Sequence, residues 1–166
     1  MTERELSNLD LWMWEYPDNR KNYPGIHLTG RPAACDALKE WLVRLRDTPG
    51  GGTRTIPLLA LKPEDIAKIS GTLRYRGFSK LELTVTPERD DLQQMSIRQE
   101  GERVILEITS MGIGELLRGI QDVRTGTGDY SIRPQADRAV GHKLGRLDRE
   151  SLCLWFWACF GHLAVT

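Results

Sequence analysis

The chain has 166 residues, a length that suits one ordinary domain with a sizeable core. Lysine and arginine together number 23, as do aspartate and glutamate, so the formal net charge is zero. This balance argues against a general nucleic-acid binder and against a protein that adheres to anionic membranes. We predict a single domain over residues 1–166.

The three cysteines are Cys35, Cys153 and Cys159. An odd number with no regular spacing predicts reduced thiols, as in a cytoplasmic protein. The first ten residues are polar and lack the apolar run of a signal peptide. The longest apolar run, LCLWFWACF, is too short to span a membrane. We therefore expect a cytoplasmic location.

The first third of the chain predicts three strands and one helix. Residues 11–16, LWMWEY, predict a strand that is apolar on both faces, and residues 25–30 predict the next strand. Helical spacing over residues 31–47 predicts a helix that glycines 50–52 end. Residues 53–61 predict a strand in which Pro57 marks an edge or a bend. The apolar stripe of the helix consists of Ala34, Leu38, Trp41, Leu42 and Leu45.

The middle of the chain predicts a short helix at residues 63–73 and a half-exposed strand at residues 80–85. In that strand Leu81, Leu83 and Val85 alternate with polar residues. Residues 87–94 are polar and form the predicted junction between two halves of the chain. Residues 95–110 predict a hairpin that turns at residues 100–102.

The last third predicts an amphipathic helix at residues 111–123 and a strand at residues 129–134. A long polar loop is predicted to follow over residues 133–146, and residues 152–160 predict a final strand that is apolar on both faces. The apolar stripe of the helix consists of Ile113, Leu116, Leu117, Ile120 and Val123.

These elements predict an α+β fold: a mainly antiparallel sheet of about seven to nine strands, with two principal helices packed on one face. The order strand, helix, glycine stop, strand occurs at residues 25–58 and again at residues 103–134. Two interpretations of this ββαβ-like unit stay open. One is a true duplication into halves 1–87 and 88–166, and the other is convergence on a common unit.

The sequence carries no recognisable catalytic, metal or cofactor motif. The glycine-rich stretches TPGGGT and TGTGDYS follow helices, whereas phosphate loops precede them, so we interpret both as helix stops. Cys153, Cys159 and His162 lack the paired short spacing of zinc ligands. The two cysteines would lie roughly 20 Å apart in a straight strand. Cys35 and His142, the conceivable further ligands, do not change this conclusion.

Cys35 and His27 are residue types that often act in catalysis, but each has a simpler structural explanation here. Cys35 lies near the start of the first helix, where a thiolate would be stabilised, yet a small residue packed on the sheet explains it equally well. His27 lies on its strand opposite the apolar residues, so we expect it at the surface. We predict no catalytic residue.

Charged segments suggest partners more than reactions. Residues 73–80, LRYRGFSK, interleave basic and aromatic side chains as in single-strand nucleic-acid binders, but the neutral net charge weakens that interpretation. Residues 88–102 carry five acidic against two basic side chains, and residues 133–146 carry four basic against one acidic. Such segments are usually solvated loops, and they can also orient a partner.

We predict a non-catalytic binding or protein-interaction protein of immunity or accessory type, with a protein partner. The alternative is an enzyme or small-ligand-binding domain whose site is assembled from distant residues. An aromatic face left open by the helices would favour a homodimer. Its interface candidates are Trp12, Trp14, Tyr16, Trp155 and Trp157.

Overall fold

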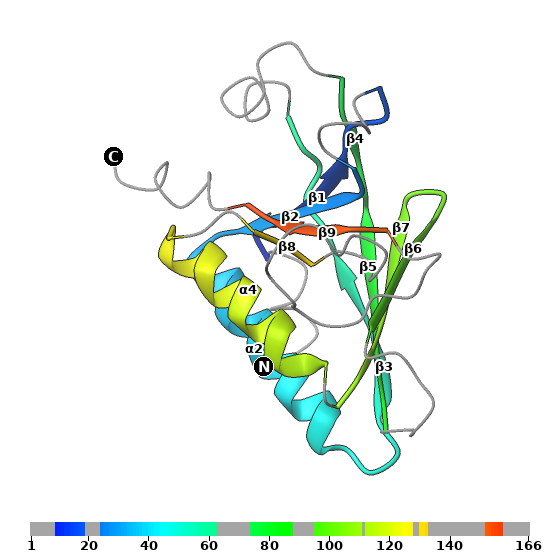
Figure 1. Ribbon diagram of the computed structural model, residues 1–166. Coiled ribbons are helices and arrows are strands. Elements are labelled where there is room, and N and C mark those ends of the chain that lie inside the picture. The colour runs from blue at the N-terminus through cyan, green and yellow to red at the C-terminus, as the bar shows by residue number, and fades with distance from the viewer. Residues whose placement is uncertain are drawn as a thin grey trace, which may run out of the picture.

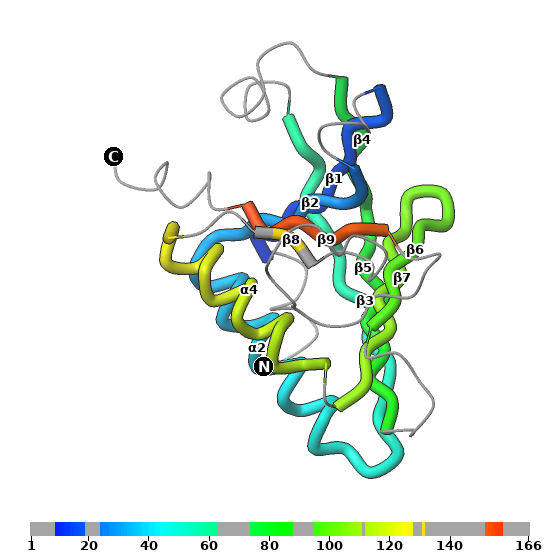
Figure 2. Tube along the Cα trace, in the orientation of Figure 1, coloured from blue at the N-terminus to red at the C-terminus, as the bar shows by residue number. Residues whose placement is uncertain are grey.

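The computed structural model describes residues 9–18, 24–62, 74–87, 95–110, 112–127, 130–132 and 152–157. These residues form two helices and nine strands, which are arranged in two sheets (Figures 1 and 2). Sheet A has the strand order β4-β1-β2-β9-β8, and sheet B has the order β3-β5-β7-β6. The α+β class predicted from the sequence is confirmed.

Sheet A consists of β1 (Leu11–Glu15), β2 (Ile26–Gly30), β4 (Arg76–Gly77), β8 (Tyr130–Ile132) and β9 (Leu154–Phe156). Sheet B consists of β3 (Gly52–Pro57), β5 (Lys80–Thr86), β6 (Met95–Glu100) and β7 (Arg103–Thr109). The helices are α2 (Pro32–Asp47) and α4 (Ile113–Thr125). In the ranges that the structure covers, no helix combines the length and apolarity needed to cross a membrane.

Most of the local predictions agree with these bounds to within about two residues. The strand predicted at residues 53–61 is shorter than expected, because β3 ends at Pro57. The β6–β7 hairpin turns where expected, and the alternation of β5 separates a buried row from a half-exposed one. The helix predicted at residues 63–73, the loop at residues 133–146 and the end of the final strand at residues 158–160 lie outside the described residues.

The strand pairing is mainly antiparallel, as predicted, but the strands divide between two mixed sheets instead of forming one. Five of the seven strand pairings that the structure describes are antiparallel, while β2 pairs with β9 and β5 with β7 in parallel. Each helix carries the chain from one sheet to the other: α2 joins β2 to β3, and α4 joins β7 to β8. Local periodicity cannot report this division, because both parallel pairings join segments far apart in sequence.

The two helices lie side by side along one side of the molecule, with sheet B opposite them and sheet A across one end (Figure 1). Polar contacts also join the helices. Lys39 donates to Gln121 at 2.5 Å, and the Arg124 guanidinium to the Asp36 carboxylate at 2.6 Å. Both predicted helix stripes are buried except at one position each, since Leu45 and Leu117 are only partly buried. Leu117 therefore lies at the margin of the core and not in it.

The glycine-rich stretches end the helices, as predicted. Gly126 adopts a φ of +69° after α4, and its N–H bonds to the carbonyl of Val123 at 3.3 Å. Gly51, after α2, has a φ of +76°. A Cβ atom there would lie 2.1 Å from the carbonyl oxygen of Val85, so only glycine fits.

The two sheets repeat one pairing pattern. The antiparallel pair β1–β2 corresponds to β6–β7, the parallel pair β2–β9 to β7–β5, and the antiparallel pair β9–β8 to β5–β3. In chain order, β1-β2-α2-β3-β5 would correspond to β6-β7-α4-β8-β9. This is the pattern that a duplication into halves 1–87 and 88–166 would produce, and the duplication stays a prediction.

Candidate functional site: the outer face of the four-stranded sheet

Sheet B turns one face to the helices and the other to solvent. Successive side chains of a strand point to opposite faces, so the register sorts them into rows. Leu81, Leu83, Val104 and Leu106 face the core, where each is at most 1% exposed. The opposite rows bring together Thr53, Thr84, Glu107 and Ser96, then Thr55, Glu82, Ile105 and Arg98, then Lys80, Arg103 and Glu100.

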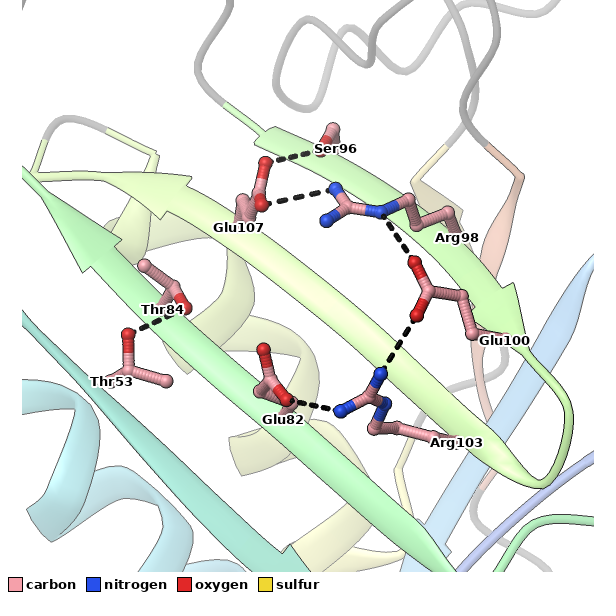
Figure 3. Close-up of polar contacts among 8 residues, drawn as sticks. All are labelled: Thr53, Glu82, Thr84, Ser96, Arg98, Glu100, Arg103 and Glu107. Atoms are coloured by element: carbon pink, nitrogen blue, oxygen red, sulfur yellow. Dashed lines mark hydrogen bonds and ion pairs between the residues drawn. The ribbon is translucent and has the colours of Figure 1, made fainter.

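A continuous chain of ion pairs crosses this outward side (Figure 3). Arg103 contacts Glu82 on β5 at 2.9 Å and Glu100 on β6 at 2.7 Å. Arg98 contacts Glu100 at 3.7 Å and Glu107 at 3.0 Å. The hydroxyl of Ser96 donates to the second carboxylate oxygen of Glu107 at 3.5 Å. We call these six residues, Glu82, Ser96, Arg98, Glu100, Arg103 and Glu107, the polar face.

The residues of the polar face are half-buried or exposed, and its charges do not cancel. It contains three carboxylates and two guanidiniums, so its formal charge is 2 − 3 = −1. The exposed fraction of the side chains ranges from 27% at Glu82 to 51% at Glu100. Ion pairs at this exposure contribute about 0.2–1 kcal/mol each to stability. The network therefore sets a charge pattern on the surface more than it holds the fold together.

Ile105 lies within this charged surface. Its register partners are Arg98 on β6 and Glu82 on β5, and it is 3% exposed. It belongs to β7, which pairs in parallel with β5 at the centre of sheet B. Parallel strands are usually covered on both faces. In the described part of the chain, the helices cover only the inner face of this pair.

The sequence indicated part of the polar face. Alternation in the predicted hairpin places Ser96, Arg98 and Glu100 on one side of β6. The acidic segment 88–102 thus contributes Arg98 and Glu100, while its residues 88–94 and the basic segment 133–146 lie outside the described residues. The link from Arg103 to Glu82 was missed, because it depends on the parallel pairing of β7 with β5.

The aromatic residues of β1 occupy the face of sheet A opposite the helices. Trp12, Trp14 and Tyr16 form a cluster separate from the main core, and each is at most 8% exposed. Leu59, Leu61 and Tyr75 pack against them. The segment after β3 lies along β1, where the N–H of Leu59 bonds to the carbonyl of Leu11 at 2.9 Å. Side chains of the segment after β3 thus pack on this face, which the two helices leave open.

His27 is buried, so the prediction of a surface histidine is wrong. It does lie opposite the helix-packed residues of β2, but its exposed fraction is zero. Its ring stacks between Trp14, with centroids 5.3 Å apart, and Trp155, with centroids 5.9 Å apart. Tyr16 and Trp157 meet it edge-on at 5.0 Å and 5.8 Å. The sequence did not reveal this cluster of rings around His27, because the rings come from three segments that are far apart in the sequence.

Among the predicted interface residues, only Trp155 and Trp157 are half-buried, and the other three are buried inside the chain. The indole N–H of Trp155 donates to the carbonyl of Pro24 at 2.5 Å. A homodimer through this face would therefore rest on Trp155 and Trp157, and it stays a prediction that light scattering tests.

Cys35 is unsuited to nucleophilic chemistry. Burial, with a smaller contribution from Asp36, raises the pKa of its thiol to about 12. The thiol contacts the carbonyl of Gly30 at 3.7 Å. Within the described ranges, no three side chains of the ligand types histidine, cysteine, aspartate and glutamate gather closely enough to hold a metal ion. Cys159, His142 and His162 lie outside those ranges.

Two of the three basic residues of segment 73–80, and both of its aromatic residues, already have contacts within the chain. Arg76 contacts the buried carboxylate of Glu15 at 2.5 Å, and Arg74 contacts Asp18 at 3.8 Å. Phe78 belongs to the main core and is 2% exposed, so its ring is not available for stacking on a base.

Comparison with known proteins gives one partial similarity to report. No family model matches the chain, and no solved structure matches it. A probable acetolactate synthase small subunit from Archaeoglobus fulgidus is 38% identical over 65 residues. The match covers 39% of this chain and 41% of that protein, so the chain spans less than half of the relative. A match of this extent assigns no family.

Proposed function

We propose that this protein is a non-catalytic interaction protein of accessory or immunity type, which binds a partner protein through the polar face. The observation that carries the proposal is the continuous network of Glu82, Arg103, Glu100, Arg98 and Glu107 across β5, β7 and β6, in which each side chain is at least 27% exposed. Three strands hold its members in fixed register, so the charge pattern is rigid. Rigid patterns of alternating charge favour specific partners and penalise wrong ones.

The chemistry of the polar face indicates the kind of partner surface. Carboxylates outnumber guanidiniums, and Glu102 on the adjoining turn is exposed as well. A surface rich in lysine or arginine would complement this excess, with a carboxylate placed to meet Arg98 or Arg103. Ile105 supplies an apolar floor beneath these charges. Such a contact would associate faster at low ionic strength, because complementary fields steer the encounter.

The partial relative is consistent with an accessory role. Its name describes it as a small subunit, that is, as one component of an assembly. Carried over as a proposal, this supports a chain that acts by binding another protein. The shared region is too short to extend the relative's enzyme or its partner to this chain.

Affinity capture from native lysate with matched charge variants tests the proposal. The test variant is Glu100→Lys with Glu107→Lys, which reverses two of the three carboxylates of the polar face. The control is Glu40→Lys with Asp47→Lys, which also reverses two carboxylates, both on α2 and paired with Arg44 and Arg46. Mass spectrometry would identify a partner retained by the wild type and the control, and calorimetry with that purified partner would measure affinity.

We expect the double variant to bind at least about tenfold more weakly, with a loss that shrinks as salt rises. Equal affinity for the double variant and the wild type would contradict the assignment of the polar face. Equal weakening by the control double variant would show a general charge effect and would contradict it as well.

A further inference from the structure

Strand β3 forms one edge of sheet B, and its outer side is exposed. It pairs with β5 on one side only. Thr53, Thr55 and Pro57 are exposed, while Ile56 between them is buried in the core. An edge strand of six residues presents a row of backbone groups to which another extended chain can pair.

The pattern of backbone bonds shows which groups face outward. The N–H of Leu58 donates to the carbonyl of Ser79 at 2.9 Å, in continuation of the β3–β5 register. Hydrogen-bonded pairs alternate along an antiparallel ladder, so Ile56 and Arg54 also bond to β5. The N–H and C=O groups of Thr53 and Thr55 therefore point away from the sheet. The described part of the chain places no hydrogen-bond partner on them.

Arg54 supplies a charge beside this edge. Its guanidinium lies over the ring of Trp41 on α2, 5.2 Å from the ring centroid. Within the described residues it forms no ion pair, in contrast to Arg98 and Arg103 on the polar face. An added antiparallel strand would place one residue directly opposite Arg54 in a non-hydrogen-bonded pair. In such a pair the Cα atoms are about 4.5 Å apart and the side chains are closest.

We propose that the outer edge of β3 is a strand-addition site for an extended segment of a partner protein that carries an acidic side chain opposite Arg54. The backbone groups of Thr53 and Thr55 supply the main-chain bonds, and Arg54 selects the charge. Pro57 has no N–H to donate, so it limits the pairing at that end. This site is separate from the polar face and does not depend on the function proposed for it.

Hydrogen exchange of the full chain, followed by NMR, tests this site with two defined probes. Both are blocked peptides of about seven residues in which threonine and valine alternate. One has a central glutamate and the other a central lysine. We expect the glutamate peptide to slow exchange of the Thr53 and Thr55 amides, and to bind about tenfold more tightly than the lysine peptide. The Arg54→Glu variant should reverse that preference.

A second variant tests the backbone bonds themselves. Thr55→Pro removes an outward N–H without removing a bond to β5, so a folded variant should lose most of the protection by the peptide. Equal affinity for both peptides, or protection elsewhere than at β3, would overturn the proposal. So would protected Thr53 and Thr55 amides in the wild type without peptide, since a second copy would then occupy the edge. The wild-type comparison stands even if a variant fails to fold.

Discussion

Cys35 shows how burial decides the chemistry of a single side chain. Its thiol lies at the start of α2, where a helix dipole would favour the thiolate, yet the side chain is fully buried between helix and sheet. The cost of removing a charge from water exceeds the benefit of the dipole, and the pKa rises to about 12. The position of a residue along a helix therefore did not predict its reactivity.

This pKa predicts a pH dependence of stability. In the unfolded chain the thiol ionises near its ordinary value of 9.0, and in the folded protein only near 12. Between these values the unfolded state binds fewer protons, so the contribution of Cys35 is complete below about pH 9 and is lost as pH rises toward 12. Denaturation of the wild type and the Cys35→Ala variant should therefore show a difference in stability that shrinks above pH 9. A constant difference would contradict the burial of the thiol.

Gly25 is a second residue with a specific role. Its φ is +89°, and a Cβ atom there would lie 2.2 Å from the carbonyl oxygen of Cys153, next to β9. Gly25→Ala should therefore cost about 2 kcal/mol or more, through backbone strain and separation of β2 from β9. The control is Gly101→Ala, with a φ of +60° and no atom within 4 Å of the added Cβ, which should cost about 1 kcal/mol. Chemical denaturation measures both, and equal losses would contradict a close approach at Gly25.

At the scale of elements, two neighbouring leucines of α4 lie on either side of the core boundary. Leu116 is 1% exposed, whereas its neighbour Leu117 is only partly buried. Leu116→Ala should cost about 2–5 kcal/mol in the free energy of unfolding. Leu117→Ala should cost about 1 kcal/mol, because water already reaches part of that site. Urea denaturation of both variants decides this, and a larger loss at Leu117 would show that the helix is rotated.

At the scale of the whole molecule, each half of the chain contributes strands to both sheets. Residues 1–87 contribute β3 and β5 to sheet B, where β5 pairs with β7 of the other half. Residues 88–166 contribute β8 and β9 to sheet A, where β9 pairs with β2. Helices α2 and α4 also pack against each other. Neither half therefore holds a complete sheet of its own. We propose that a duplication produced this arrangement.

Interlocked halves should stay together after the chain is cut. A protease site inserted between Pro87 and Met95 allows one cut at the junction of the halves. We expect both fragments to elute as one particle of unchanged size, with a lower unfolding temperature because the connection is lost. The uncut insertion variant is the control. Separate elution of two folded fragments would show independent units and would contradict the contribution of each half to both sheets.

The sequence by itself determined the local elements of this protein. Alternation predicted β5 and the β6–β7 hairpin, and helical spacing predicted most of the buried residues of α2 and α4. It missed the buried Ala37, and it placed Leu45 and Leu117 in the core although they are only partly buried. These features follow from the periodicity of 2.0 and 3.6 residues, which neighbouring residues already display. The α+β class and the glycine stops followed from the same local information.

Only the tertiary structure decided the division into two sheets, the burial of His27 and the polar face. Each depends on which distant strands pair: β2 with β9 encloses His27 between Trp14 and Trp155, and β5 with β7 brings Glu82 to Arg103. A strand pattern specifies which side chains share a face, but not which strand lies beside it. That choice comes from the packing of the whole core, and it placed both candidate interaction sites of this protein on sheet B.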